Sequence, residues 1–214
     1  MKKLGIISIG AALLAAAAIP GLAAAQETPW SVRLGVTQLE PANKSDPFKD
    51  TLTFSADAIS VSKKTLPEFD VYYSFNPNLV AELVLTIPQQ HTVNLAGVGD
   101  LGTFKQLPPT LLAQWHFMPA QQFDPYIGAG VNFTWISSVH LNVAPLNQNL
   151  DLKKSSWGLA LEAGVDFNVD KRWYVNANIK YVNPLQTDVT LNGAKVTTVK
   201  VDPYLYSLGV GYHF

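Results

Sequence analysis

Large apolar and small residues alternate along the C-terminal segment of the chain. Every second residue from Tyr204 to Phe214 is aromatic or apolar, whereas Ser207, Gly209 and Gly211 stand between them. A period of two predicts a β-strand whose two faces differ in character. A face this apolar must be covered by a protein core or by lipid.

Seven further segments show the same alternation, separated by turn-forming residues. The expected strands, with the C-terminal one last, span 28–40, 65–75, 79–90, 103–117, 124–136, 155–167, 173–181 and 202–214. Their connections alternate in length: short near Asn76, at 119–123 and at 168–171, and longer near 41–64, 92–102, 139–152 and 189–198. This alternation is typical of outer-membrane barrels, which have short periplasmic turns and longer extracellular loops.

Seven charged residues share the face opposite the apolar one. These residues are Arg33, Glu68, Asp70, Glu82, Glu162, Asp166 and Lys180. In a soluble lipocalin-like barrel the apolar side chains point inward around a ligand, and seven charges would line a dry pocket only at high cost. The pattern therefore predicts an all-β fold, an eight-stranded antiparallel transmembrane β-barrel of the outer-membrane type with its charges in the lumen.

Aromatic residues fall near the predicted periplasmic ends of the strands, where an interfacial ring is expected. They are Trp30, Tyr73, Phe75, Phe117, Phe167, Trp173, Tyr212 and Phe214. Composition agrees, because 48% of the residues are hydrophobic and only 14% are charged, which supplies little polar cover for a water-facing surface.

The N-terminus has the features of a secretory signal. Lys2 and Lys3 precede an alanine-rich apolar stretch that ends at Pro20 and Gly21, before small residues suited to cleavage. We expect residues 1–25 to be a signal peptide and 26–214 to form the barrel in the outer membrane of a Gram-negative bacterium, a retained membrane anchor being the alternative. Without the two lysines, 13 basic residues face 16 acidic ones, a balance that argues against a nucleic-acid partner.

Several stretches resemble the outer-membrane protein W (OmpW) family, which includes an alkane-import barrel. The stretches are LPPTLLAQWHF (107–117), PYIGAGVNFT (125–134), SWGLALEAGVDF (156–167) and VDPYLYSLGVGYHF (201–214). The resemblance implies a narrow hydrophobic channel for small apolar molecules. Phe214 resembles the C-terminal signal that barrel-assembly machinery reads, and the expected surroundings are outer-membrane lipid and lipopolysaccharide. The segment 41–64 departs most from the family.

Other motifs predict no cofactor, metal or catalysis. The spacing G-x-G-x-x-G at 97–102 is followed by a proline-interrupted strand rather than a helix, so it predicts a loop. None of the four histidines pairs with another at metal-ligand spacing. An outer-membrane enzyme could use Ser137, Ser138, His140 and Asp151, but such residues are ordinary at loop rims, and we expect no enzyme.

The order of inward residues along the strands predicts a charged floor below an apolar outer funnel. The expected solute path consists of Val84, Thr86, Pro88, Pro108, Pro109, Thr110, Leu112 and Val182. Because prolines lack a ladder donor, Pro88 and Pro108 with Pro109 mark a possible gap between two strands. The hypothesis is passive uptake of small hydrophobic molecules with lateral release into the membrane. The alternative is a structural or adhesive barrel that acts through its loops. The lumen of such a barrel should be filled by polar side chains along its whole height.

Overall fold

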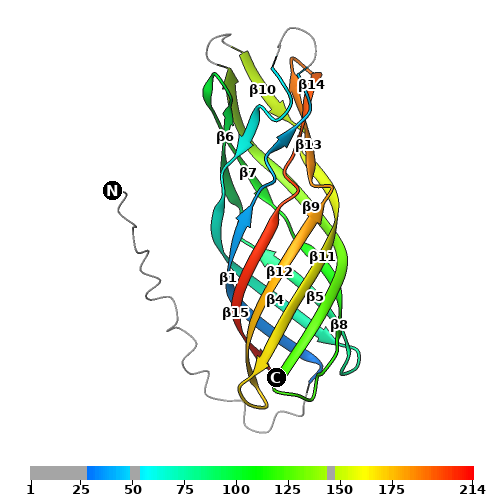
Figure 1. Ribbon diagram of the computed structural model, residues 1–214. Helices are drawn as coiled ribbons and strands as arrows, with labels where there is room; N and C mark the ends of the chain where they lie inside the picture. The colour runs from blue at the N-terminus through cyan, green and yellow to red at the C-terminus, as the bar shows by residue number, and fades with distance from the viewer. Residues whose placement is uncertain (1–27, 49–53, 144–147) are drawn as a thin grey trace, which may run out of the picture.

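Eight antiparallel strands form a closed barrel in the computed structural model, which describes residues 28–48, 54–143 and 148–214 (Figure 1). In order around the barrel they are β1 (Trp30–Glu40), β4 (Lys64–Ser74), β5 (Leu79–Thr86), β8 (Thr110–His116), β9 (Phe123–Val143), β11 (Ser155–Asn168), β12 (Trp173–Asn183) and β15 (Tyr204–His213). The ring closes because β15 pairs with β1, for example Val36 with Leu208. This confirms the predicted fold; the predicted signal peptide, 1–25, lies outside the described residues.

A second tier of strands continues above one end of the barrel, beside the upper part of β9 (Figure 1). It consists of β2 (Lys44–Ser45), β3 (Ile59–Val61), β6 (Gln89–Leu95), β7 (Gly99–Leu107), β10 (Gln148–Leu152), β13 (Gln186–Leu191) and β14 (Ala194–Lys200). The long connections predicted from the sequence are thus largely strand. Among the described residues, no helix is long and apolar enough to cross a membrane.

Two predicted strands are each divided in the structure. The segment 79–90 becomes β5 and β6, which are separated at Ile87 and Pro88, and the segment 103–117 becomes β7 and β8, which are separated at Pro108 and Pro109. Each proline lacks the N–H that a ladder hydrogen bond requires. The two segments counted as single strands are therefore four strands, and the breaks fall at the prolines that the sequence had marked.

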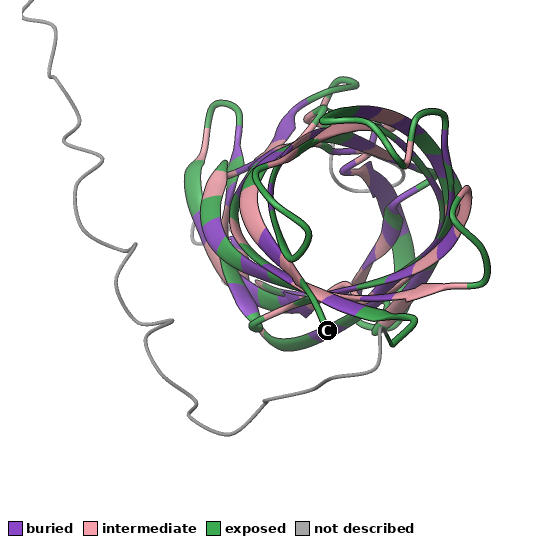
Figure 2. Ribbon diagram, turned by 90° about the horizontal axis from the view of Figure 1, so that it is seen from below, coloured by how far each residue is buried: buried purple, intermediate pink, exposed green. Residues whose placement is uncertain are grey.

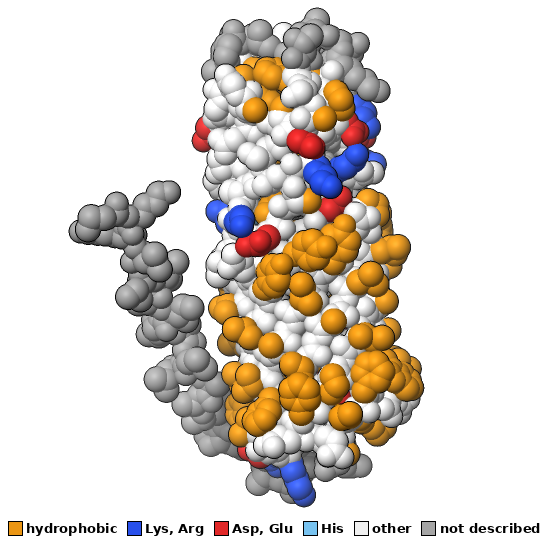
Figure 3. All heavy atoms as spheres, in the orientation of Figure 1, with side chains coloured by type: hydrophobic (Ala, Val, Ile, Leu, Met, Phe, Trp, Pro, Cys, Tyr) orange, Lys and Arg blue, Asp and Glu red, His pale blue; other side chains and the backbone are white. Residues whose placement is uncertain are grey.

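The predicted faces are confirmed along the barrel strands. Leu208 is 62% exposed while its neighbour Ser207 is 4% exposed, and the same alternation runs around the ring in Figure 2. Apolar side chains gather in a belt over the lower part of the molecule, with charged side chains above it (Figure 3). Because the short turns and the C-terminus lie below this belt, that end is assigned to the periplasm.

Aromatic side chains mark both edges of the belt. At the lower edge Trp30, Tyr73 and Phe75 pack edge to face, as do Trp173, Tyr212 and Phe214. At the upper edge Trp135 and Trp157 are highly exposed, and Tyr181 stacks on Tyr204. Rings of this kind settle at the membrane–water interface, so the two edges define the span.

Glycines on the inner face make room for two buried tyrosine rings. A Cβ atom at Gly211 would overlap the ring of Tyr174, and one at Gly164 would overlap Tyr126. The small positions that alternate with the apolar ones in the C-terminal strand therefore have a packing role. They leave room for the large side chains of their direct ladder partners, since Tyr174 pairs with Gly211 and Tyr126 with Gly164.

Replacing Leu161 with arginine is expected to lower the free energy of unfolding by about 2 to 4 kcal/mol, because a cation would face lipid near mid-membrane. Leu161 is 58% exposed and lies between the two aromatic edges on β11. Asn94→Arg, on an exposed site of the upper tier, is the control and should change stability little. Unfolding by urea in lipid vesicles measures both; equal losses would contradict the assigned span.

Candidate functional site: a charged plug below an apolar chamber

Arg33 is the centre of a buried ionic network that closes the lumen. From β1 its Nε donates to Asp70 Oδ2 at 2.7 Å, and its Nη2 lies 3.0 Å from Glu82 Oε1 and 3.3 Å from Glu68 Oε1. Its Nη1 donates to Asn176 Oδ1. One guanidinium thereby ties together side chains of β1, β4, β5 and β12, using its several donors in a fixed geometry.

Lys180 makes the second centre, on β12. Its Nζ lies 3.0 Å from Glu68 Oε1 and 3.4 Å from Glu162 Oε1. Gln114 donates from its amide nitrogen to both Glu82 and Glu162, at 2.8 Å each. These contacts link β8 and β11 to the same network, so it extends across the barrel.

We call this network the charged plug. Its members are Arg33, Glu68, Asp70, Glu82, Glu162 and Lys180, all at most 5% exposed. Charges buried this deeply persist only when they are paired and hydrogen-bonded. Six of the seven residues predicted for the charged floor therefore meet in one cluster, as their shared strand face indicated.

Asp166, the seventh predicted floor residue, lies apart from the plug toward the periplasmic mouth. It accepts a hydrogen bond from Asn176 at 2.6 Å and lies 4.0 Å from His116 Nδ1. His116 Nδ1 is 2.7 Å from Asp124 Oδ2. Possible ligand atoms of His116, Asp124 and Asp166 all lie within 4.8 Å of one another, an arrangement compatible with a cation that sequence spacing did not reveal.

Above the plug the interior becomes apolar. Val84, Leu112, Ala160 and Val182 are each at most 4% exposed and begin a cluster that continues to the top of the upper tier. We call this cluster the apolar chamber. Its other buried members are Phe48, Ala58, Ile59, Val61, Val93, Leu95, Leu101, Phe104, Ile136, Leu141, Val143, Leu150, Leu152, Leu185, Val189, Leu191, Val196, Val199 and Val201.

The apolar chamber is nearly filled by its own side chains. The cavity between Val61, Phe104, Leu141 and Val189 has a volume of about 20 Å³, roughly the room that one water molecule needs. A larger solute can enter only when these side chains move apart.

The strand ladder is interrupted beside the chamber. The β5–β8 ladder ends at the pair Val84–Thr110, and the β6–β7 ladder begins at Gln89–Gln106. We call residues 85–88 and 107–109 the ladder gap. In the described structure, no residue of the first segment is a ladder partner of a residue of the second. The segment 85–88, between β5 and β6, is one residue longer than the segment 107–109, between β7 and β8, as in a β-bulge.

Polar side chains back the ladder gap from inside. Asn132 donates to Thr110 Oγ1 at 2.8 Å and lies 3.3 Å from the Pro108 carbonyl oxygen. Gln89 donates to Thr86 Oγ1 at 3.1 Å, while its own Oε1 is buried without a protein partner. These groups supply polar partners beside a stretch of backbone that pairs with β4 and β9 on its outer sides but not across the gap.

The predicted path residues fall into two groups. Val84, Leu112 and Val182 lie in the apolar chamber, Thr110 is buried, and Thr86, Pro108 and Pro109 are partly buried at the ladder gap. Pro88 is exposed, as is Ile87 before it. The inward orientation predicted for Pro88 was wrong because the alternation breaks at the bulge.

The four residues considered for catalysis lie exposed on the upper tier. His140 Nδ1 is 2.9 Å from the Ser138 carbonyl oxygen, and Asp151 Oδ1 accepts from the Leu152 amide at 2.8 Å. Neither contact joins a serine hydroxyl to the imidazole, as an activated nucleophile requires. The described hydrogen bonds therefore supply no catalytic alignment at this rim.

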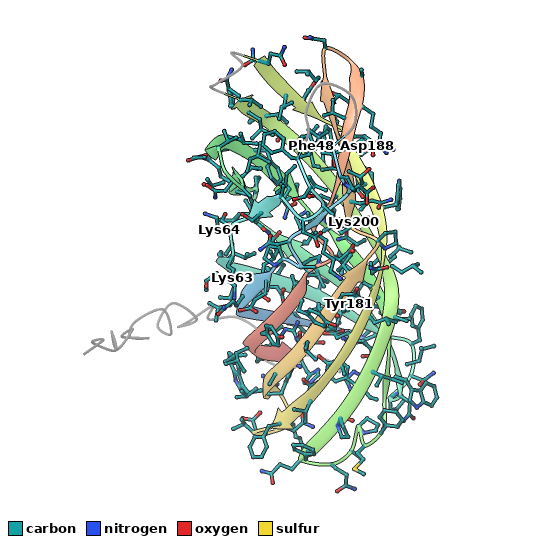
Figure 4. The ribbon with its side chains drawn as sticks, turned by 45° about the horizontal axis from the view of Figure 1, so that its top comes forward. Phe48, Lys63, Lys64, Tyr181, Asp188 and Lys200 are labelled. Atoms are coloured by element: carbon teal, nitrogen blue, oxygen red, sulfur yellow. The ribbon has the colours of Figure 1, made fainter. Side chains whose placement is uncertain are left out.

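Ion pairs outside the membrane belt connect segments of the upper tier, in which Figure 4 labels Asp188 and Lys200. Lys200 lies 2.7 Å from Asp46, and Lys195 lies 2.6 Å from Asp188. The hydrogen bond from Lys200 lowers the pKa of Asp46, and the one from Lys195 lowers the pKa of Asp188. Both carboxylates stay ionised well below neutral pH and join β2, β13 and β14.

Comparison with known proteins gives concordant matches. Residues 26–214 match the model of the OmpW family. The outer membrane protein W of Vibrio cholerae is 33% identical, with 96% of this chain and 97% of that protein covered. The crystal structure of OprG from Pseudomonas aeruginosa superposes with a TM-score of 0.76 at 30% identity, covering 88% of this chain and 97% of that one. A P. aeruginosa protein named for a dibenzothiophene metabolism operon is 26% identical, covering 89% and 90%.

Proposed function

Because the chain belongs to the OmpW family of outer-membrane barrels, we propose that it admits small hydrophobic molecules through its apolar chamber and releases them sideways into the membrane. The observation that carries this proposal is the change of character along the lumen. An apolar interior reaches down from the upper tier and stops at the charged plug. Next to that junction the wall of the barrel lacks part of its ladder.

Burial in the apolar chamber favours capture. Removing apolar surface from water is worth about 25 cal/mol per Å², and the chamber wall is made almost wholly of Val, Leu, Ile and Phe side chains. A solute that separates these side chains replaces their mutual contacts with its own. Capture therefore needs a transient opening of the upper tier but no energy source.

The charged plug opposes straight passage into the periplasm. Its ion pairs and hydrogen bonds involve seven of the eight barrel strands, and an apolar solute would have to displace them without replacing them. Each polar group left unpaired in the interior costs on the order of 1 to 3 kcal/mol. The lateral path is therefore the easier one.

The ladder gap supplies that path at a suitable height. Leu107 pairs with Trp135, so the gap lies level with the upper aromatic edge. Ile87 is 58% exposed on its outer side. A solute leaving there would pass from the chamber to the hydrocarbon near the outer leaflet, without crossing the plug. The relative named for dibenzothiophene metabolism is consistent with apolar cargo.

Replacing Leu112 with aspartate tests capture. We expect cells that express the chain to take up the apolar fluorescent probe N-phenylnaphthylamine several times faster than cells without it. Leu112→Asp should remove most of this gain, because a carboxylate would enter a chamber position that is 2% exposed. Leu112→Met, which keeps the wall apolar, should retain it.

Both variants must reach the cell surface as folded barrels, which the heat-dependent shift of barrel proteins on gels establishes. If folded Leu112→Asp takes up the probe as fast as the unsubstituted chain, the chamber is not the entry route. If the unsubstituted chain gives no gain over empty cells, the transport function itself is wrong.

A further inference from the structure

Two lysines flank a serine on the outer surface just above the upper aromatic edge. Lys105 on β7 is the ladder partner of Ser137 on β9. On the other side of β9, Ser155 pairs with Trp135, and the Ile136 amide donates to the Lys154 carbonyl at 2.8 Å. Lys153 lies in the break between β10 and β11, where the register with β9 shifts by one residue: the β11 register continued places it beside Ser137 and the β10 register beside the adjacent, equally exposed Ser138.

The three residues therefore form a row across adjacent strands. Neighbouring strands are about 4.8 Å apart, so two ammonium groups can approach one anion over the Ser137 hydroxyl. Lys105, Ser137 and Lys153 are all exposed, and the exposed Lys154 follows directly at the turn. We call these four residues the lysine row.

The aromatic residues below fix the depth of the lysine row in the membrane. Trp135 is 61% exposed and lies one outward position below Ser137, and Trp157, 67% exposed, lies lower again on β11, where its ring is 4.7 Å from that of Phe133. Tryptophan occupies the interface between hydrocarbon and head groups. The lysine row therefore lies at head-group height.

The lysine row also differs from several other surface lysines in its pairing. Lys63, Lys195 and Lys200 of the upper tier and its border each form an ion pair with a carboxylate. Lys44, Lys64 and Lys171, like the row, form none with a described residue, but they stand singly or at the periplasmic turn. Lys105, Lys153 and Lys154 form none with any residue in the described segments. The nearby acids are engaged elsewhere: Asp188 with Lys195 and Thr198, and Asp151 with the Leu152 amide. Positive charge is thus left available there.

We propose that the lysine row binds a phosphate group of a phosphorylated lipid in the outer leaflet, the lipid A part of lipopolysaccharide. The phosphate balances the positive charge of the lysines and accepts charge-assisted hydrogen bonds from their ammonium groups. The Ser137 hydroxyl donates one further hydrogen bond to it. The acyl chains then lie over the exposed tryptophans and the apolar belt below. This site is independent of the solute path inside the barrel.

Each basic residue near an anionic lipid surface strengthens binding about five-fold. Exchanging all three lysines for glutamine is therefore expected to weaken lipid A binding about 100-fold. The full-length protein in mild detergent is titrated with bisphosphorylated lipid A, and native mass spectrometry counts the bound lipid. The matched control is K171Q/R172Q, which removes exposed basic charge at the periplasmic turn.

We expect K105Q/K153Q/K154Q to lose binding of lipid A and K171Q/R172Q to retain it. We also expect enzymatically dephosphorylated lipid A to bind the unsubstituted protein weakly, with the affinity that the triple variant has for intact lipid A. Equal binding by the two variants would overturn it, and so would equal binding of the dephosphorylated lipid. Displacement by inorganic phosphate at the same concentration would overturn the assignment to a lipid. Should the triple variant fail to fold, K105Q/K153Q gives the same comparison with an expected loss of about 25-fold.

Discussion

Replacing Arg33 with methionine is expected to lower the free energy of unfolding by about 3 to 5 kcal/mol, because it removes one partner from a buried ionic network. Arg33 is 1% exposed and contacts the carboxylates of Glu68, Asp70 and Glu82. Without the guanidinium, only Lys180 remains to balance the plug's carboxylates. The loss therefore reflects uncompensated buried charge more than the removed contacts.

Urea unfolding in lipid vesicles, followed by tryptophan fluorescence, measures this loss. Arg172→Met is the matched control: within the described residues, the side chain of this exposed arginine of the periplasmic turn forms one hydrogen bond, to Tyr212 Oη at 3.2 Å, and its loss should cost little. Adding Asp70→Asn to Arg33→Met should recover part of the stability, since it removes one unpaired charge. An Arg33→Met variant as stable as Arg172→Met would show that the plug carries no stabilising pair.

The inward and outward faces of the barrel strands follow directly from sequence parity. Side chains in a strand alternate between the two faces. Once the apolar face is assigned to lipid, the alternation of Ser207 and Leu208 therefore determines that Leu208 faces lipid and Ser207 faces the lumen. For the same reason the charged plug was predictable as a set. Its members are charged, inward by parity and near the same height on their strands.

Parity fails where the backbone departs from the ladder. Pro88 was assigned to the lumen, yet it is exposed because the bulge at Ile87 and Pro88 shifts the phase. The bulge depends on how β5 and β6 pair with β8 and β7, which are distant in the chain. The alternation of apolar and polar residues within one segment does not predict the one-residue difference in register between the β5–β8 and β6–β7 ladders.

The sequence pattern also could not predict which side chains of different strands come into contact. His116, Asp124 and Asp166 come from the consecutive strands β8, β9 and β11 and meet because the register of these strands makes Asp166 the ladder partner of Asp124 and sets His116 beside them. Parity places the uncharged partners of the plug, Gln114 and Asn176, on the inner face, but it does not indicate which charged side chains they contact, since polar inward residues are common in such lumens. The upper tier was likewise visible only as connection length.

Tying the two sides of the ladder gap together is expected to abolish uptake of an apolar probe. Ile87 and Leu107 lie on the two sides of the gap: the β5–β8 register continued places Leu107 opposite Ile87, and the β6–β7 register places it opposite Pro88, the next residue. The chain contains no cysteine, so Ile87→Cys and Leu107→Cys introduce the only thiols. A cross-link between them, by oxidation or with a short bis-maleimide, holds the gap closed while the chamber and the plug stay unchanged.

The matched control places the same cross-link where the ladder is intact. Val36 and Leu208 are direct partners on β1 and β15, and both face outward. Cysteines at these two positions should form the bond without effect on uptake, because no solute passes between these strands. The comparison separates closure of the gap from general stiffening of the barrel.

Uptake of N-phenylnaphthylamine before and after cross-linking of Ile87→Cys/Leu107→Cys tests lateral release most directly. The expected result is a fall to the rate of cells without the protein, with full recovery when the disulfide is reduced, while Val36→Cys/Leu208→Cys stays at the unsubstituted rate. Quantitative cross-linking across the gap with an unchanged rate of uptake would contradict release between β5 and β8.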